Sequence, residues 1–168
     1  MALYLIANGA MQTTAAFVPV TTGVTIKTLL QIKPLTGVDL KIKEWGISFD
    51  GSAAATPGRI ELIETDVAAT VTASVTADIT KLTNPAGPAA DSGLVSLGTS
   101  ATGYTASVEG STTAVRNLDA PQFIAPTNQF IKQFPLGNEP IIQAGKFGRI
   151  RVTFGIAVNA YCYIIFEG

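Results

Sequence analysis

Charge, histidine and cysteine are all scarce in this chain. Only 14% of its 168 residues are charged, against about a quarter in an ordinary soluble domain. There is no histidine and only one cysteine. Without an imidazole, neither a Ser-His-Asp nor a Cys-His catalytic arrangement can be built, and structural zinc needs Cys/His clusters. The composition therefore favours a structural role, with much of the surface covered by other protein or built from Thr, Ser and Gly.

The distribution of charge and of apolar residues limits the partners further. The formal net charge is −1 and no Lys/Arg cluster is present, whereas binding to a nucleic-acid backbone needs several clustered cations. The N-terminal apolar run is short, follows no cationic segment and meets Asn8 and Gly9 almost at once. We therefore expect neither a secretory signal nor a membrane span, and synthesis in the cytoplasm.

Carboxylates and the single thiol are the remaining candidates for catalysis. Glu44, Glu61 and Glu64 fall on segments that could be neighbours, and paired carboxylates can hydrolyse glycosides. Solvated strand faces carry such residues routinely, so we expect no enzyme, no metal ion and no cofactor. Cys162 lies in an apolar strand pattern and is interpreted as a buried small hydrophobe. The parity of Trp45, the only tryptophan, predicts a core position rather than a sugar platform.

The periodic segments have the composition of short strands. Val, Ile, Thr, Tyr and Phe dominate them, and Gly, Pro, Asn and Asp separate them. Residues 40–49 and 59–65 are predicted to pair as a hairpin with a long loop. In the first of these arms the apolar residues change parity, so we expect a β-bulge near residues 44–46 that returns them to one core face. The second arm alternates simply and is expected to be covered on one face only.

The remainder of the chain extends this pattern to a whole domain. Residues 66–115 are rich in Ala, Thr, Ser and Gly and are interpreted as a low-complexity, loop-rich insert that contains weak strands. Residues 160–166 are apolar on both parities, which is typical of a central strand. About eight to ten strands without helical crossovers predict an all-β fold, an antiparallel β-sandwich of jelly-roll type that spans residues 1–168 as a single domain.

A short N-terminal segment, residues 1–12, stands apart from the main core pattern. Its apolar residues Leu3, Tyr4, Leu5 and Ile6 form a short strand before a turn. Two interpretations are open: an ordinary edge strand of the sandwich, or an arm that adds to a neighbouring subunit. Under the second interpretation these four residues bind a partner, which agrees with the low surface charge.

Several stretches of the sequence resemble small β-rich virion proteins of tailed bacteriophages. The first is residues 43–51 with the Ala-rich loop that follows and residues 59–63; the others are residues 134–140, 149–153 and 157–161. Together they cover somewhat under half of the chain. They concern fold and turns and contain no catalytic signature, so no functional residue carries over by position.

The resemblance implies a head-decoration, or cement, protein on the exterior of the capsid, commonly a trimer. Its partners would be the major capsid protein and further copies of itself, and its location would be the virion. The long insert at 66–115 is the departure from this pattern. Because of it, the protein could instead be a different part of the virion. The alternatives are a tail or baseplate β-protein, and a carbohydrate-binding β-sandwich, which would need an aromatic platform or a calcium site.

Overall fold

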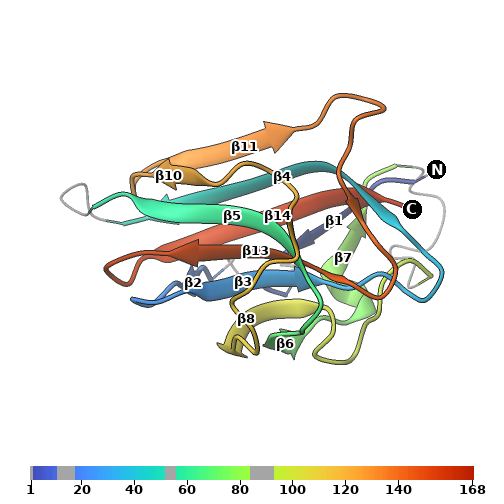
Figure 1. Cartoon of the computed structure of the whole chain (residues 1–168), viewed down its shortest axis with the longest axis horizontal. Helices are drawn as coiled ribbons and strands as arrows, with labels where there is room; N and C mark the ends of the chain where they lie inside the picture. The colour runs from blue at the N-terminus through green and yellow to red at the C-terminus, as the bar shows by residue number, and fades with distance from the viewer. Residues whose placement is uncertain (1, 11–17, 52–55, 84–92) are drawn as a thin grey trace.

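A computed structural model describes residues 2–10, 18–51, 56–83 and 93–168. Nearly all of the regular structure in these residues is β-strand, as expected from the sequence (Figure 1). The elements are β1 (Tyr4–Ala7), β2 (Val20–Thr21), β3 (Lys27–Ile32), β4 (Leu40–Asp50), β5 (Gly58–Thr65), β6 (Thr70–Ala73), the 3-10 helix η1 (Thr76–Asp78), β7 (Ile79–Lys81), β8 (Gly103–Val108), β9 (Arg116–Asn117), β10 (Gln122–Ile124), β11 (Gln129–Gln133), β12 (Ile141–Ile142), β13 (Phe147–Thr153) and β14 (Asn159–Glu167).

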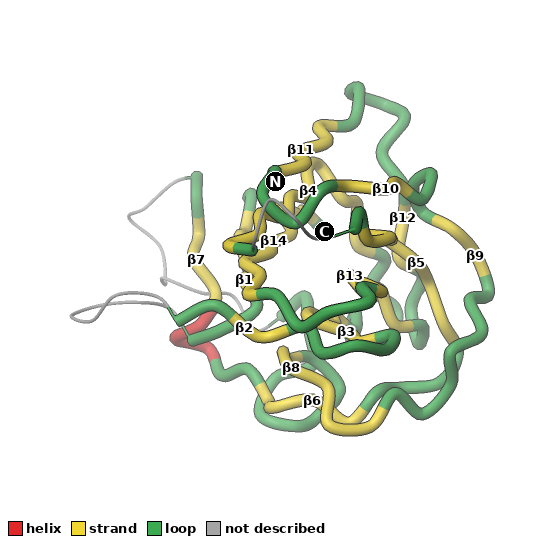
Figure 2. The backbone as a smooth tube through the Cα atoms, turned by 90° about the vertical axis from the view of Figure 1, so that its left-hand side faces the viewer, coloured by secondary structure: helices red, strands yellow, loops and turns green. Residues whose placement is uncertain are grey.

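Two antiparallel sheets pack face to face, which confirms the predicted β-sandwich. Sheet A has the order β11-β4-β14-β1-β7, and sheet B has the order β10-β5-β13-β3-β8-β6. The short strands β2 and β12 join sheet A, and β9 joins sheet B. Viewed from the end of the sandwich, β4, β14 and β1 lie across the core from β5, β13 and β3 (Figure 2). The apolar side chains between the sheets form one continuous core.

The strand order is that of a jelly roll. Numbered along the chain, β1, β3, β4, β5, β10, β11, β13 and β14 give eight strands, which lie as 1-8-3-6 in sheet A and 2-7-4-5 in sheet B. In this arrangement successive strands mostly alternate between the two sheets, as two Greek keys require. The insert at 66–115 supplies β6, η1, β7 and β8. It extends sheet A beside β1 and sheet B beside β3, so it is part of both sheets.

The hairpin predicted from residues 40–49 and 59–65 is wrong. β4 lies in sheet A between β11 and β14, and β5 lies in sheet B between β10 and β13. The connection after β4 therefore crosses from one sheet to the other instead of turning back beside it. Alternation of side chains fixes which face of a strand is buried, but it contains no information about which strand pairs with it.

The β-bulge predicted near residues 44–46 is present one position earlier. Ile165 lies opposite Glu44, and Phe166 lies opposite Ile42, so Lys43 is the extra residue of β4. This single residue reverses the parity of the strand. Consequently the apolar residues on both sides of the bulge face the core, namely Leu40, Ile42, Trp45, Ile47 and Phe49.

The C-terminal strand is central in its sheet, as predicted. β14 pairs with β4 on one side and β1 on the other. Cys162, Ile164 and Phe166 are buried in the core, whereas Tyr161 and Tyr163 point to the outer face of sheet A and stay partly exposed. The core position of Trp45 is also confirmed, and its indole N–H donates to a carboxylate oxygen of Asp119 at 3.0 Å.

Candidate interaction surface

The described residues contain no cluster of metal-binding side chains. No group of three or more His, Cys, Asp or Glu that could hold an ion lies within residues 2–10, 18–51, 56–83 and 93–168. Cys162 is buried, and this burial raises the pKa of its thiol well above the usual value, which disfavours the reactive thiolate. In the same part of the chain, no helix has the length and apolar character needed to cross a membrane.

The three glutamates considered for acid catalysis are engaged in separate places. Glu61 accepts a hydrogen bond from Nε of Arg151 at 2.7 Å, and Glu64 accepts one from Nη2 of Arg116 at 2.9 Å. Glu44 lies on β4 in sheet A, whereas both other glutamates lie on β5 in sheet B. The predicted hairpin would have brought these strands together. In the observed fold they do not form a pair.

Two buried arginines hold a loop over the outer face of sheet B. Arg149 donates through Nη1 to the backbone carbonyls of Glu109 and Ser111, at 3.1 and 3.2 Å, and Arg151 donates through Nη1 to the carbonyl of Thr112 at 2.5 Å. Both arginines lie on β13, and the loop that they bind joins β8 to β9. The arginines therefore fasten a cover onto this sheet.

The cover changes the environment of β5. We expected this strand to be half covered, but Glu61 and Ile63 on its outer face are buried as fully as Ile60 and Leu62 on its core face. The expectation is wrong because a loop covers the outer face of β5. This loop lies far from β5 along the chain, so the pattern of the strand itself does not indicate it. Polar side chains that alternate with apolar ones are usually solvated, and here they form buried ion pairs instead.

The edge of the sandwich at β10 and β11 exposes large apolar side chains. Phe123 on β10 is 75% exposed, Ile131 on β11 is 55% exposed, and Leu136 in the turn after β11 is 85% exposed. We call these three residues the β10–β11 edge. Both strands lie along the same border of the molecule (Figure 1). Exposed apolar side chains along one border offer a surface that another molecule can cover.

A hollow of about 620 Å³ adjoins this edge at the end of β11. Its lining is mainly apolar and includes Leu3, Phe134 and Leu136. Lys43 also lines it, but its ammonium group is bound to carboxylates of Glu139 at 2.6 Å and Glu167 at 2.9 Å. The charges in the wall are thus paired with one another, and the hollow can receive an apolar group from a partner.

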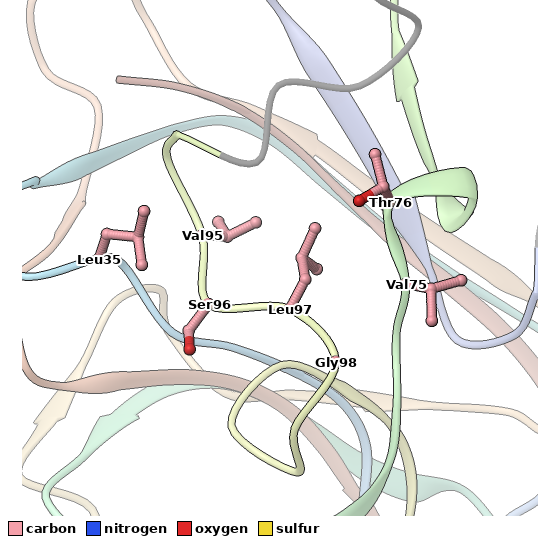
Figure 3. A pocket seen from close by; sticks show the side chains of 7 residues that line it. All are labelled: Leu35, Val75, Thr76, Val95, Ser96, Leu97 and Gly98. Carbon is pink, nitrogen blue, oxygen red and sulfur yellow. The ribbon is translucent and has the colours of Figure 1, made fainter.

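A second hollow, of about 410 Å³, lies on the side of the insert. Figure 3 shows Val95 and Leu97 with their side chains on one side of their segment, near Leu35, while Ser96 points the other way. Val95 and Leu97 belong to the core and its margin. None of the lining residues is charged, so this hollow offers packing surface and little chemistry.

The N-terminal residues predicted to bind a partner lie in a strand that is paired on both sides. β1 lies between β14 and β7, so it is an inner strand of sheet A. Tyr4 and Ile6 are buried in the core of the chain itself, whereas Leu3 and Leu5 stay partly exposed. Residues 1, 11 and 12 of the proposed arm lie outside the described residues. The partner-binding role of this segment stays a prediction, and Leu3 in the hollow beside the β10–β11 edge is the residue best placed for it.

Comparison of the chain with protein-family models, with curated proteins and with solved structures gives no match.

Stability is expected to stay flat between about pH 6 and pH 8 and to fall in alkaline solution. The chain has no histidine, and burial raises the pKa of Cys162, Tyr161 and Tyr163 in the folded state. A group whose pKa is raised by folding contributes its full stabilisation below its unfolded-state pKa. That contribution is lost as the pH rises from there through the folded-state pKa. The decline should therefore begin at about pH 8.5, where an unfolded thiol ionises.

Thermal melts in steps from acid to alkaline pH test this expectation. A Cys162→Ala variant should lose the earliest part of the alkaline decline while keeping the part that is due to the tyrosines. A sharp change of melting temperature between pH 6 and pH 8 would contradict the expectation.

Proposed function

We propose that this protein is a non-catalytic structural component of a tailed-phage virion that decorates the capsid by binding the assembled lattice of the major capsid protein. The β10–β11 edge is the contact surface, with the adjoining hollow as the pocket for an apolar side chain of the capsid. The observation that carries the proposal is the exposure of Phe123, Ile131 and Leu136 along one border of a jelly roll. The resemblance of the sequence to small virion proteins supports it independently.

The mechanism of reinforcement is mass action. A subunit that binds only the assembled lattice stabilises that state by its binding free energy, which grows with the ratio of free subunit to dissociation constant. A virion repeats the contact at every equivalent lattice position. Even a modest contact per subunit then adds up to a large effect on the shell, and the protein needs no catalytic group.

The scarcity of charge also supports self-association, most simply as a trimer on the capsid exterior. A chain with 14% charged residues has more uncharged surface than an isolated domain of this size usually leaves in water. In an oligomer with closed symmetry, such a surface is buried because a patch of each subunit packs against a patch of the next. Light scattering of the purified chain measures the stoichiometry directly.

Replacement of Phe123 and Leu136 together by Ser is expected to abolish attachment to the capsid. Both side chains are exposed, so their loss should leave the melting temperature almost unchanged. Burial of each against a partner would contribute about 1.5–3 kcal/mol, and loss of both should weaken binding by at least about a hundredfold. Co-sedimentation with empty expanded capsids of the phage that encodes the chain measures the binding.

Val108→Ser is the matched control for this experiment. Val108 is also exposed, but it lies on β8, toward the opposite edge of sheet B from β10. This variant should bind capsids like the unmodified chain. If the unmodified chain does not sediment with capsids but does bind purified tails, the tail or baseplate alternative is correct. If the double variant still saturates the capsids, the β10–β11 edge is not the contact.

A further inference from the structure

Two tyrosines form an aromatic shelf on the outer face of sheet A. Tyr161 and Tyr163 are alternate residues of β14 and so point to the same side of the sheet. Their ring centroids are 6.0 Å apart and the ring planes meet at 37°. Both side chains are partly exposed. We call this pair the tyrosine shelf.

The ring of Tyr163 is held close to β4 by its neighbours. Gly46 lies opposite it on β4, and a Cβ atom at Gly46 would lie only 2.6 Å from the ring. The absence of that atom leaves room for the ring over Gly46. At the far end of the ring the Tyr163 hydroxyl donates to a carboxylate oxygen of Glu44 at 2.6 Å. The ring is thus fixed in position and orientation before any ligand arrives, which lowers the entropic cost of binding.

A small hollow of about 130 Å³ lies beside the shelf. Its lining combines the two rings with apolar surface, a hydroxyl group and a primary amide. The lining residues are Ile47, Ser48, Gln129, Ile131, Tyr161 and Tyr163. No charged side chain lines the hollow. The carboxylate of Glu44 accepts the hydrogen bond of the Tyr163 hydroxyl.

We propose that the tyrosine shelf and this hollow bind one pyranose ring of a neutral polysaccharide. The C–H face of a sugar ring is apolar and packs on an aromatic face, while the sugar hydroxyls around its rim need both donors and acceptors. The amide of Gln129 and the hydroxyl of Ser48 provide both. The uncharged lining selects neutral sugars, and the small volume means that one ring of a longer chain occupies the site.

A single shallow site of this kind binds weakly, and repetition makes it useful. Linked copies on one particle raise the effective concentration of each site for the next unit of a polysaccharide. The proposal does not depend on capsid decoration, because any assembly that repeats the chain gains the same avidity. The site shares Ile131 with the β10–β11 edge but does not use Phe123 or Leu136, so substitutions at those two residues and at Tyr163 test the two surfaces separately.

The test is affinity electrophoresis of the purified chain in gels that contain a soluble polysaccharide. The neutral probes are hydroxyethylcellulose, soluble starch and galactomannan. Alginate is the charged control. We expect retardation by at least one neutral probe and none by alginate. Tyr163→Ala should weaken that retardation by roughly tenfold, since it removes the ring that forms the shelf.

Two further variants show whether the effect belongs to the ring. Tyr163→Phe keeps the aromatic face and should retain most of the binding, although it loses the hydrogen bond to Glu44. Tyr104→Ala removes a partly exposed tyrosine from β8 in the other sheet and should bind like the unmodified chain. Melting temperatures confirm that each variant is folded.

Three results would overturn the proposal. The first is no retardation by any neutral probe, and the second is equal retardation of folded Tyr163→Ala and the unmodified chain. The third is loss of capsid co-sedimentation by Tyr163→Ala without any polysaccharide binding, which would assign the shelf to a protein interface. The first two results come from gels that contain no capsid, so failure of the capsid experiment with Phe123 and Leu136 has no bearing on them.

Discussion

Removal of residues 2–7 is expected to unfold the protein. The deletion eliminates β1, an inner strand of sheet A, and so leaves β14 and β7 without a shared neighbour. It also removes the buried side chains of Tyr4 and Ile6 from the core. A single large-to-small substitution at such a position costs about 2–5 kcal/mol, and the whole domain has about 5–15 kcal/mol of stability. The loss of the strand is therefore comparable with the total.

Circular dichroism and urea unfolding of the truncated chain measure this effect. Ile6→Ala and Leu5→Ala form a matched pair of milder variants, because Ile6 is buried and Leu5 is partly exposed on the same strand. We expect a loss of about 2–5 kcal/mol for the first and about 1 kcal/mol or less for the second. A truncated chain that melts as before would show that β1 is not part of the core. If that folded chain also failed to bind capsids, the result would support the interpretation of the N-terminal segment as an arm that binds a partner.

The burial pattern of individual strands could be predicted from the sequence because it is local. In β4 the change of parity between Ile42 and Trp45 predicted a bulge, and the bulge lies at Lys43. The core positions of Trp45 and Cys162 followed from the same alternation. Each of these inferences needs only the period of a strand and the preference of apolar side chains for the interior.

Strand pairing could not be predicted in the same way, because it is decided by long-range packing. β4 and β5 are consecutive and amphipathic, yet they lie in opposite sheets. The arginines of β13 show the same limit. Arg149 and Arg151 alternate with apolar residues as on a solvated face, and only a loop some distance along the chain makes them buried.

The tyrosine shelf is not indicated by the apolar character of residues 160–166 taken as a whole. An apolar run on both parities does not separate Tyr161 and Tyr163 from their neighbours. A signal was nevertheless present, since the two tyrosines share one parity and Cys162, Ile164 and Phe166 share the other. Gly46, which makes room for the ring of Tyr163, could not be assigned from sequence because it requires the register between β4 and β14.

Replacement of Arg149 by Met is expected to cost about 1–3 kcal/mol and to release the loop that covers sheet B. Two effects oppose each other here. Removal of the buried guanidinium relieves its desolvation, which already lowers the pKa of Arg149. Against this, the partly buried backbone carbonyls of Glu109, Ser111 and Val67 each lose a hydrogen bond from the guanidinium. The Glu109 carbonyl keeps the Ser111 N–H as donor and the Val67 carbonyl keeps the Thr65 hydroxyl, so the Ser111 carbonyl is affected most. An acceptor left unsatisfied costs about 1–3 kcal/mol, and the Glu109 carboxylate also loses the positive charge that lies 3.7 Å away, so the losses outweigh the relief.

The control for this substitution is Lys146→Met, which breaks an exposed ion pair with Asp66 and should cost about 1 kcal/mol or less. Urea unfolding gives both free energies, and hydrogen exchange of the loop between β8 and β9 reports whether it opens. In Arg149→Met the loop amides should exchange faster than the amides of β13, since the loop loses its anchor while the strand keeps its partners in sheet B. Equal stability losses in the two variants, or an unchanged loop, would mean that contacts other than those of Arg149 hold the cover. Glu109 would then be the anchor that remains, because its carboxylate accepts hydrogen bonds at 2.6 Å from the backbone N–H and the hydroxyl of Thr28.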